Sequence, residues 1–262
     1  MNIPSLIGIF GALGALVISM FWGGTGVLAF LDVPSTFIVV VASIAIVIYS
    51  GPKLSDGLGI FNSIAMTFKT PSFGELEIAR KLLSFSEKAR REGLLSLEEE
   101  VQDVENDFLR TGLRLSIDGT DRDVILNLLE MEINKMQERH SKKARFLDLL
   151  AQVAPACGMW GTVVGLVGMM KNLASDPAMV GPNMATALIT TLYGSVLANV
   201  MAIPAARKLR FYDAQETNAR EMIVEGVLSI QAGDNPRILG QKLLAFLSPQ
   251  DRRALEQEVK KD

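Results

Sequence analysis

Four stretches of the chain contain no Asp, Glu, Lys or Arg, and each is long enough to cross a lipid bilayer. They comprise residues 1–31, 33–52, 149–170 and 177–206. A helix needs about 20 mainly apolar residues to span the hydrocarbon core, where every backbone polar group must be bonded within the protein. The stretches therefore predict an all-α integral membrane protein with four transmembrane helices, at residues 3–22, 33–50, 147–170 and 184–206.

The basic residues lie almost entirely in two regions outside these stretches. Of 26 Lys and Arg residues, 15 lie in residues 53–145 and 10 follow residue 206. Cytoplasmic loops of membrane proteins carry such an excess, so we place both regions, and with four crossings both termini, in the cytoplasm. The predicted segments are transmembrane helices 1 and 2 (1–52), a cytoplasmic helical domain (53–146), transmembrane helices 3 and 4 (147–206) and a cytoplasmic helical tail (207–262).

Both cytoplasmic segments have helical patterns. Apolar residues recur at intervals of three and four within residues 75–91 and 94–113, and a longer helix is predicted over residues 121–145, starting at Asp121. In the tail, the fourth transmembrane helix continues to about Gln231, and a short helix after Pro236 ends near Phe246. We therefore expect the cytoplasmic domain and the tail to be helical.

The third predicted transmembrane helix carries a stripe of small residues. Spacings of three and four place them within an arc of roughly 100° on a helix: Ala151, Ala154, Gly158, Gly161, Gly165 and Gly168. Small residues allow membrane helices to approach closely, and similar stripes in residues 8–19 and 187–202 predict a tightly packed, self-associating bundle. Pro155, near the start of this helix, and Pro204, near the end of the fourth, are candidate hinges because proline removes a helical hydrogen bond.

Hydroxyl groups border the small-residue stripes within the membrane. Thr162 lies on the third helix, and Thr190 and Thr191 lie on the fourth. Hydroxyl and carbonyl oxygens can replace part of the hydration shell of a cation, although such hydroxyls can also bond back to their own helix. We interpret Thr162, Thr190 and Thr191, together with Pro155, as part of an ion pathway.

No carboxyl group lies deep in the four stretches. Asp148 lies near the start of the third transmembrane helix, and the remaining acids are in loops. Membrane proteins that carry ions usually employ an intramembrane acid. If this chain moves cations by a carboxylate relay, another subunit must supply the carboxylate, and we expect the groove over residues 151–168 to receive a helix of that partner, with Thr162 facing it.

Charges of opposite sign flank Gly93 in the cytoplasmic segment 86–100. The basic residues are Lys88, Arg90 and Arg91, and the acidic residues are Glu98, Glu99 and Glu100. Such a surface can dock a charged partner with fast, salt-dependent association, and the alternative is two solvated helix ends.

Signatures of enzymes and nucleic-acid-binding proteins are missing from the sequence. It has no Gly-Lys-Ser/Thr phosphate-binding loop, no zinc-spaced Cys and His residues and no His-Glu-x-x-His motif. No basic patch is interleaved with aromatic residues, so we expect neither catalysis nor nucleic-acid binding.

Three segments, in this order, resemble the flagellar stator A subunits of the MotA/PomA family, within the MotA/TolQ/ExbB superfamily. They are residues 153–167, 188–199 and 226–237. The resemblance implies a protein of the bacterial inner membrane in which five A subunits surround two B subunits of the MotB/PomB type. It also implies that an Asp of the B subunit is the membrane carboxylate, and that ion flow generates torque on the rotor protein FliG.

The resemblance also implies roles for individual residues. Pro155 matches a conformationally important proline, and Thr162 and Thr191 match threonines near the ion path, with Thr190 adjacent. Arg90 and Glu98 match a charged pair used against the rotor, and their neighbours Arg91, Glu99 and Glu100 are candidates for the same surface. The two threonines favour transient Na+ over H+, with no tightly bound metal and no cofactor.

Two other functions stay open at this point. A TolQ/ExbB-type energiser acts on an envelope protein instead of a rotor, but its relatives typically have three transmembrane helices, whereas four are predicted here. A structural scaffold without ion flow is distinguished by the lack of a cation current.

Overall fold

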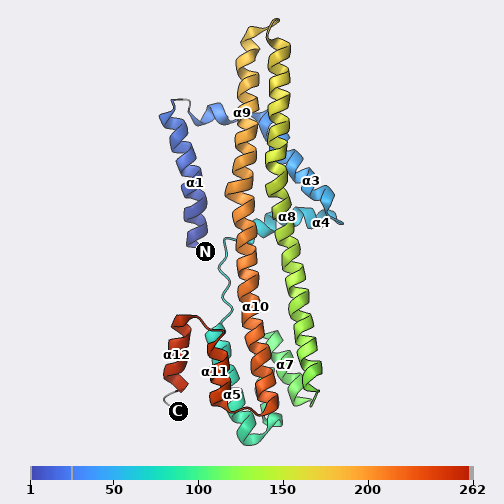
Figure 1. Cartoon of the computed structure of the whole chain (residues 1–262), viewed down its shortest axis with the longest axis vertical. Coiled ribbons are helices and arrows are strands. Elements are labelled where there is room, and N and C mark those ends of the chain that lie inside the picture. The colour runs from blue at the N-terminus through green and yellow to red at the C-terminus, as the bar shows by residue number, and fades with distance from the viewer. Residues whose placement is uncertain (1, 25, 260–262) are drawn as a thin grey trace. The chain divides into compact units, whose positions relative to one another are not determined.

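The computed structural model describes residues 2–24 and 26–259, and this part of the chain contains helices and no strand (Figure 1). Its four apolar helical stretches are long enough to cross a membrane, which confirms the predicted all-α class with four spans. Residues 1, 25 and 260–262 lie outside the described residues, so the predicted segments 1–52 and 207–262 are described only in part.

The first two spans match their predicted ranges. They are α1 (Ile3–Trp22) and the continuous stretch of α2 (Val33–Thr36), η2 (Phe37–Val41) and α3 (Ala42–Ser50). The third span belongs to α8 (Arg122–Asn172), and the fourth comprises α9 (Val180–Val196), η5 (Leu197–Ala202) and the start of α10 (Ile203–Ala232). Both η2 and η5 are π-helical segments, which hold more residues per turn than an α-helix.

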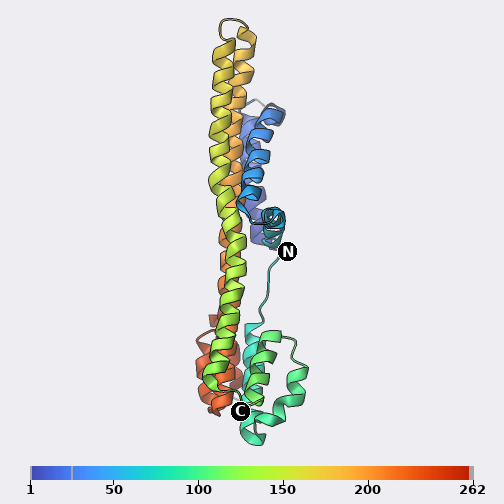
Figure 2. The ribbon, with the colours of Figure 1, turned by 90° about the vertical axis from the view of Figure 1, so that its right-hand side faces the viewer.

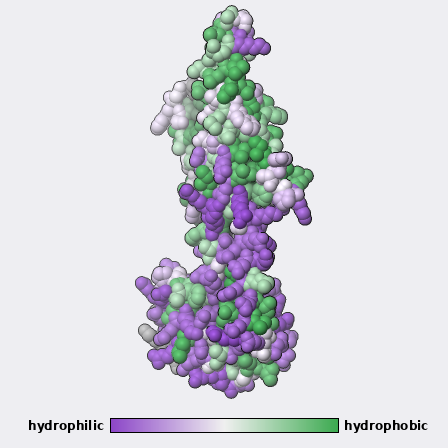
Figure 3. Space-filling model, turned by 45° about the vertical axis from the view of Figure 1, so that its right-hand side comes forward, coloured by the Kyte–Doolittle hydropathy of each residue, from purple (hydrophilic) through white to green (hydrophobic). Residues whose placement is uncertain are grey.

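The chain forms two compact units, and α8 and α10 contribute residues to both. Unit 1 contains residues 1–70 and 140–211, and unit 2 contains residues 71–139 and 212–262. Figure 3 shows hydrophobic side chains gathered over the spans and a mainly hydrophilic surface over unit 2. This contrast agrees with the four spans, whereas the boundaries of the predicted segments and their cytoplasmic location remain predictions.

The helix predicted over residues 121–145 and the span predicted over residues 147–170 form one helix of 51 residues, α8. Asp121 precedes it, as predicted, and its Oδ1 accepts a hydrogen bond of 2.9 Å from the Asp123 N–H. Residues 139–148 contain no Gly or Pro, so nothing in this stretch interrupts the helical hydrogen bonds. The prediction of two helices was wrong. The start of the apolar stretch marks where the surroundings of the helix are predicted to change from water to lipid, and this change does not interrupt the backbone hydrogen bonds.

One helix was predicted over residues 94–113, but the structure has three helical pieces there. They are η3 (Leu94–Leu97), α6 (Glu98–Gln102) and the first part of α7 (Asp107–Ile117). Asn106 starts α7, because its Oδ1 accepts a 3.0 Å hydrogen bond from the Leu109 N–H. The predicted apolar face is nevertheless buried at Leu97, Val101, Val104 and Phe108, so the spacing identified core residues correctly in a segment that bends.

Large apolar side chains form the core of unit 2. They come from α5 (Glu75–Glu92), α7, α8, α10 and α11 (Pro236–Leu244), with Leu255 of α12 (Pro249–Val259). Fully buried examples are Leu82, Leu109, Leu113 and Ile125. Burial of side chains of this size is the main source of stability for a water-exposed unit.

Unit 1 contains one further helix, α4 (Leu54–Met66), which the sequence analysis did not identify. Its Gly57 and Ile60 are buried, whereas Leu58 and Phe61 are exposed. An ion pair of 2.8 Å joins Asp56 of α4 to Lys142 of α8. This helix therefore packs on the spans through one face and leaves an apolar face open.

Candidate functional site

The small residues of α8 pack against α9 of the same chain, and the two helices lie side by side in both views (Figure 1, Figure 2). A Cβ atom added to Gly161 would lie only 2.3 Å from Cγ2 of Thr190. On the opposite helix, a Cβ atom added to Gly194 would lie 2.6 Å from the carbonyl oxygen of Ala154. We call this contact, between residues 151–168 and 183–198, the α8–α9 seam.

The expectation that this groove receives a helix of a partner subunit was therefore wrong. A Cβ atom added to Gly165 would lie 2.7 Å from the Asn183 carbonyl oxygen and from Ala187 Cβ, so the space is already filled. The fourth span carries its own small residues, including Ala187, and a short connection brings it back along α8. Because the two stripes are complementary and joined covalently, they close on each other within one chain.

The hydroxyl groups of Thr162 and Thr191 meet at the edge of the seam. Their Oγ1 atoms are 2.7 Å apart, and Thr162 Oγ1 also lies 3.1 Å from the carbonyl oxygens of Gly158 and Ala187. Thr191 is exposed and Thr162 is half-buried. Two residues that are 29 positions apart in the sequence thus form one cluster of oxygen atoms that an ion or a partner can reach from one side.

Thr190, the third threonine of the predicted pathway, lies inside the seam. Its side chain is fully buried, and its hydroxyl donates to the carbonyl oxygens of Thr186 and Ala187, each 3.0 Å away. This is the back-bonding alternative left open by the sequence. Thr190 fills the space over Gly161, so its geometry fits helix packing, and a role in the ion pathway stays a prediction.

The two candidate hinge prolines lie at different places in unit 1. Pro155 lies within α8, and its Cα atom would be 3.1 Å from a Cβ atom added to Gly194. Pro204 follows η5 and lines a groove of about 480 Å³ between α1 and α10, together with Lys208. Bending at either proline remains a prediction.

A polar stripe continues along α9 and η5 beyond Thr191. Thr191, Ser195 and Asn199 are spaced by four residues and are all exposed. The Asn199 Nδ2 donates to the Ser195 carbonyl oxygen at 3.0 Å and lies 3.3 Å from its hydroxyl. Asn199 was not among the residues predicted for the site, although the i, i+4 spacing of polar groups in an uncharged stretch could have identified it.

Asp148, the acid nearest to the third span, forms an ion pair with Arg210 of α10. Among the described residues, no three His, Cys, Asp or Glu side chains gather closely enough to hold a metal ion. The seam therefore offers oxygen atoms of hydroxyl and carbonyl groups and no carboxylate.

The predicted charged surface lies on the turn between α5 and α6. Lys88 donates a 2.5 Å hydrogen bond to Glu100, and this bond raises the pKa of Lys88 above its ordinary value. Arg90, Glu98 and Glu99 are exposed. Glu100 is also exposed but is engaged with Lys88, whereas within the described part of the chain no such ion pair holds Glu98 or Glu99.

Arg91, the remaining predicted residue of this surface, is exposed and lies 3.9 Å from Glu87 one helical turn earlier. An exposed pair at this distance contributes little to stability. Its guanidinium therefore costs little to redirect toward a partner.

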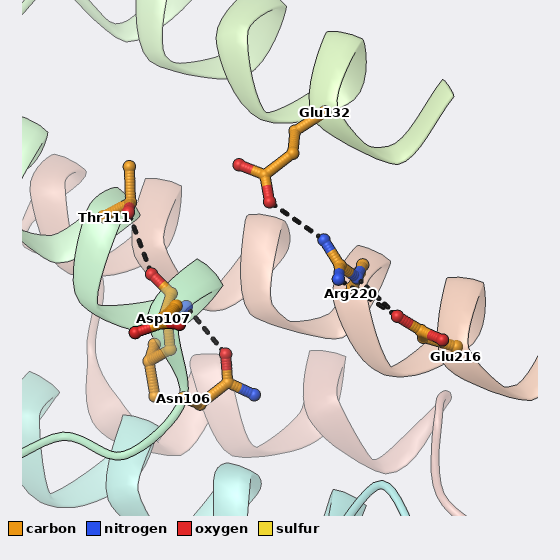
Figure 4. Close-up of polar contacts among 7 residues, drawn as sticks. Asn106, Asp107, Thr111, Glu132, Glu216 and Arg220 are labelled. Carbon is orange, nitrogen blue, oxygen red and sulfur yellow. Dashed lines mark hydrogen bonds and ion pairs between the residues drawn. The ribbon is translucent and has the colours of Figure 1, made fainter. Parts of the chain in front are cut away.

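An ion-pair network in unit 2 was not predicted from the sequence. Arg220 of α10 lies between Glu132 of α8 and Glu216, with both ion pairs at 3.0 Å (Figure 4). Its guanidinium carbon is 4.8 Å from the centre of the Phe108 ring. Arg220 thereby joins α7, α8 and α10 at the border of the unit 2 core.

Comparison with known proteins identifies the family. A model of the MotA/TolQ/ExbB proton channel family matches residues 100–222. The chain is 48% identical over 262 residues to Motility protein A of Treponema phagedenis, with 100% of both chains covered. The chain belongs to the motility protein A family. Chemotaxis protein PomA of Vibrio alginolyticus is 37% identical over 98% of this chain and 99% of its own length.

The fold agrees with this membership of the motility protein A family. The structure of the flagellar MotAB stator complex from Bacillus subtilis superposes with a TM-score of 0.87 at 30% identity, over 95% of this chain and 97% of that chain. The chain is therefore a membrane-embedded stator subunit of the flagellar motor and not an enzyme. Because full-length relatives are motility proteins, the TolQ/ExbB-type energiser is not favoured.

Proposed function

We propose that this stator subunit conducts cations together with a B subunit of the MotB/PomB type, and that the coupling ion is Na+. The observation that carries the proposal is the pair of hydroxyls of Thr162 and Thr191, 2.7 Å apart at the open edge of the α8–α9 seam. With the Ala187 carbonyl oxygen 3.1 Å from Thr162 Oγ1, three neutral oxygens can replace part of the hydration shell of a passing Na+. Neutral ligands hold the ion only transiently.

The B subunit supplies the carboxylate that this chain lacks. The spans contribute hydroxyls, and Asp148 is engaged with Arg210. A carboxylate of the partner that reaches the exposed Thr191 would complete the oxygen cluster. In the proposed complex, five copies of this chain surround two B subunits in the inner membrane, with both termini and segments 53–146 and 207–262 in the cytoplasm.

Movement of the ion is proposed to change the packing of the A subunits and to turn them against the rotor protein FliG. The proposed hinges are Pro155, near one end of the seam, and Pro204, beyond it, because each proline removes a backbone hydrogen bond. Arg90, Arg91, Glu98, Glu99 and Glu100 belong to the proposed rotor-facing surface. Within it, the ion pair of Glu100 with Lys88 joins α5 to α6.

Swimming speed measured against external sodium at fixed pH tests the ion assignment. We expect the wild-type speed to rise with sodium and to saturate. Thr191→Ala removes one oxygen ligand, so it should need roughly tenfold more sodium for half-maximal speed. Thr36→Ala, which removes another exposed hydroxyl of unit 1, is the matched control. A wild-type speed that is independent of sodium would refute Na+ and leave the stator assignment intact.

The rotor-facing surface is tested by combining Arg90→Glu with Glu98→Lys. The double variant should assemble in the membrane and carry the cation current but fail to rotate the flagellum, because both signs of the charge pattern are reversed. Normal motility of this variant would remove the proposed surface.

A further inference from the structure

One large apolar side chain is displayed in the middle of the charged turn. Leu95 of η3 is 72% exposed. Leu97 of the same turn is fully buried, and Leu94 packs against the core of unit 2. The turn is therefore anchored on both sides of Leu95, and Leu95 is exposed because its side chain points away from the core that Leu94 and Leu97 contact.

The turn that carries Leu95 is also held by polar contacts. Gly93 has a φ of 87°, a conformation that favours glycine, and its N–H donates to the Ala89 carbonyl oxygen at 2.9 Å. The Ser96 hydroxyl donates to the Gly93 carbonyl oxygen at 2.7 Å, and the 2.5 Å ion pair of Lys88 and Glu100 joins α5 to α6 across the turn. Leu95 is thus offered in a fixed position.

Exposed charges border Leu95 along the chain on both sides. Arg90 and Arg91 lie in the last turn of α5, which ends at Glu92, and Glu98 and Glu99 begin α6. An apolar centre within a charged rim is the usual anatomy of a specific protein interface, and a few central side chains supply most of the binding energy. Other exposed apolar side chains of unit 2, such as Met131 on α8 and Ile238 on α11, lie outside this turn.

We propose that Leu95 is the apolar anchor of the contact with the rotor. This inference rests on the proposed function and deepens it. The partner surface has an apolar depression between an acidic group, which faces Arg90 and Arg91, and a basic group, which faces Glu98 and Glu99. The charges steer and orient the encounter, whereas the single leucine adds binding without locking a contact that must form and break as the motor turns.

Substitution of Leu95 in the complete stator tests this role. Leu95→Asp should lower motor torque about tenfold or more, while membrane assembly and cation current stay at the wild-type level. Leu95→Met, which keeps an apolar side chain, should retain most of the torque, and Ile238→Asp, a similar change at another exposed site of unit 2, should leave it unchanged. Wild-type torque in Leu95→Asp, or loss of its assembly or current, would overturn the proposal.

Crosslinking identifies the partner directly. The only cysteine of the chain, Cys157, is buried, so Leu95→Cys introduces a single accessible thiol to which a photoactivatable crosslinker can be attached. We expect an adduct with the rotor protein from Leu95→Cys and none from Ile238→Cys. An adduct only with a second copy of this chain would show that Leu95 belongs to a contact between copies, and would overturn the proposal.

Failure of this inference is distinguishable from failure of the proposed function. If the Arg90→Glu/Glu98→Lys variant loses torque and the wild-type complex carries current, but Leu95→Asp behaves as the wild type, only the anchor is refuted. If the wild-type complex carries no cation current, the proposed function itself fails.

Discussion

The α8–α9 seam and the core of unit 2 achieve close packing in opposite ways. In the seam, glycine and alanine bring two backbones together until a single added carbon at Gly161 would overlap Thr190. In the core of unit 2, large side chains such as Leu82 and Leu113 fill the space between helices and are fully buried. Lipid is as apolar as leucine, so membrane helices associate through close contact, whereas removal of leucine from water stabilises unit 2 directly.

Because their packing differs in this way, the two regions should respond to opposite substitutions. The seam should tolerate removal of atoms better than their addition, and the core of unit 2 should be damaged most by removal. Leu113→Ala and Gly161→Ala test the two sides of this contrast, and an equal response of both regions would refute it. Lys242→Met tests a partly exposed ion pair that belongs to neither side.

Leu113→Ala should have the largest effect. Leu113 is fully buried in unit 2, and its truncation leaves a cavity that should lower the free energy of unfolding by about 2–5 kcal/mol. The melting temperature of the detergent-solubilised complex, followed by circular dichroism, measures the change. Leu113→Met keeps most of the volume and should cost less than about 1.5 kcal/mol. Equal losses from both variants would show that the packed volume at this position is not what matters.

Gly161→Ala adds one carbon to the seam and should destabilise the α8–α9 contact by about 1–3 kcal/mol, because the new Cβ atom would lie 2.3 Å from Thr190 Cγ2. Proteolysis of the membrane-embedded protein and the yield of assembled complex report the loss. Gly181→Ala at the start of α9, where an added Cβ atom meets nothing within 4 Å, is the matched control. If both variants behave like the wild type, the packing at Gly161 is not close enough to exclude an added carbon, and the predicted difference between the seam and the core of unit 2 is refuted.

Lys242→Met should have the smallest effect, below about 1 kcal/mol, because the ion pairs of Lys242 with Glu225 and Asp234 are partly exposed. The hydrogen bond from Lys242 lowers the pKa of Asp234, so its contribution is present above the ordinary aspartate pKa and is lost as pH falls through the lowered value. The difference in melting temperature between variant and wild type should therefore be present at pH 7 and shrink near pH 3. A difference that persists unchanged at pH 3 would exclude this ion pair as its cause.

The features that depend on local sequence were predictable. The uncharged stretches identified the four spans because charged side chains are costly within a bilayer. The spans are helical because every backbone polar group in lipid must be hydrogen-bonded within the protein. Asp121 marked the start of α8, and the spacing of Leu97, Val101 and Phe108 identified core residues of unit 2. In the site, the spacing of small residues identified both faces of the seam, which bring Thr162 and Thr191 together.

The remaining features depend on contacts that sequence spacing does not specify. A small-residue groove accepts any helix with a matching face, so the choice of α9 over a partner helix could not be deduced from α8 alone. The helix α4 was missed because Gly57 and Gly59 weaken its helical pattern, although Gly57 is needed where Ile48 approaches closely. The helix α12 was also missed, although the sequence offered a sign of its start, since the Ser248 hydroxyl caps it by accepting from the Asp251 N–H.

The π-helical segment η5 has a consequence for the angular phase of the fourth span. A π-helical segment amounts to one inserted residue, and one residue turns the following helix by roughly 100°. Upstream of it, the exposed Thr191 lies at the edge of the seam, and downstream of it, Ala205 and Ala206 pack with Leu147. Removal of a single residue from η5 would rotate the part of the helix that carries Ala205 and Ala206 relative to the part that carries Thr191. The extra residue therefore sets the angle between the hydroxyl edge of the seam and the packed alanine face.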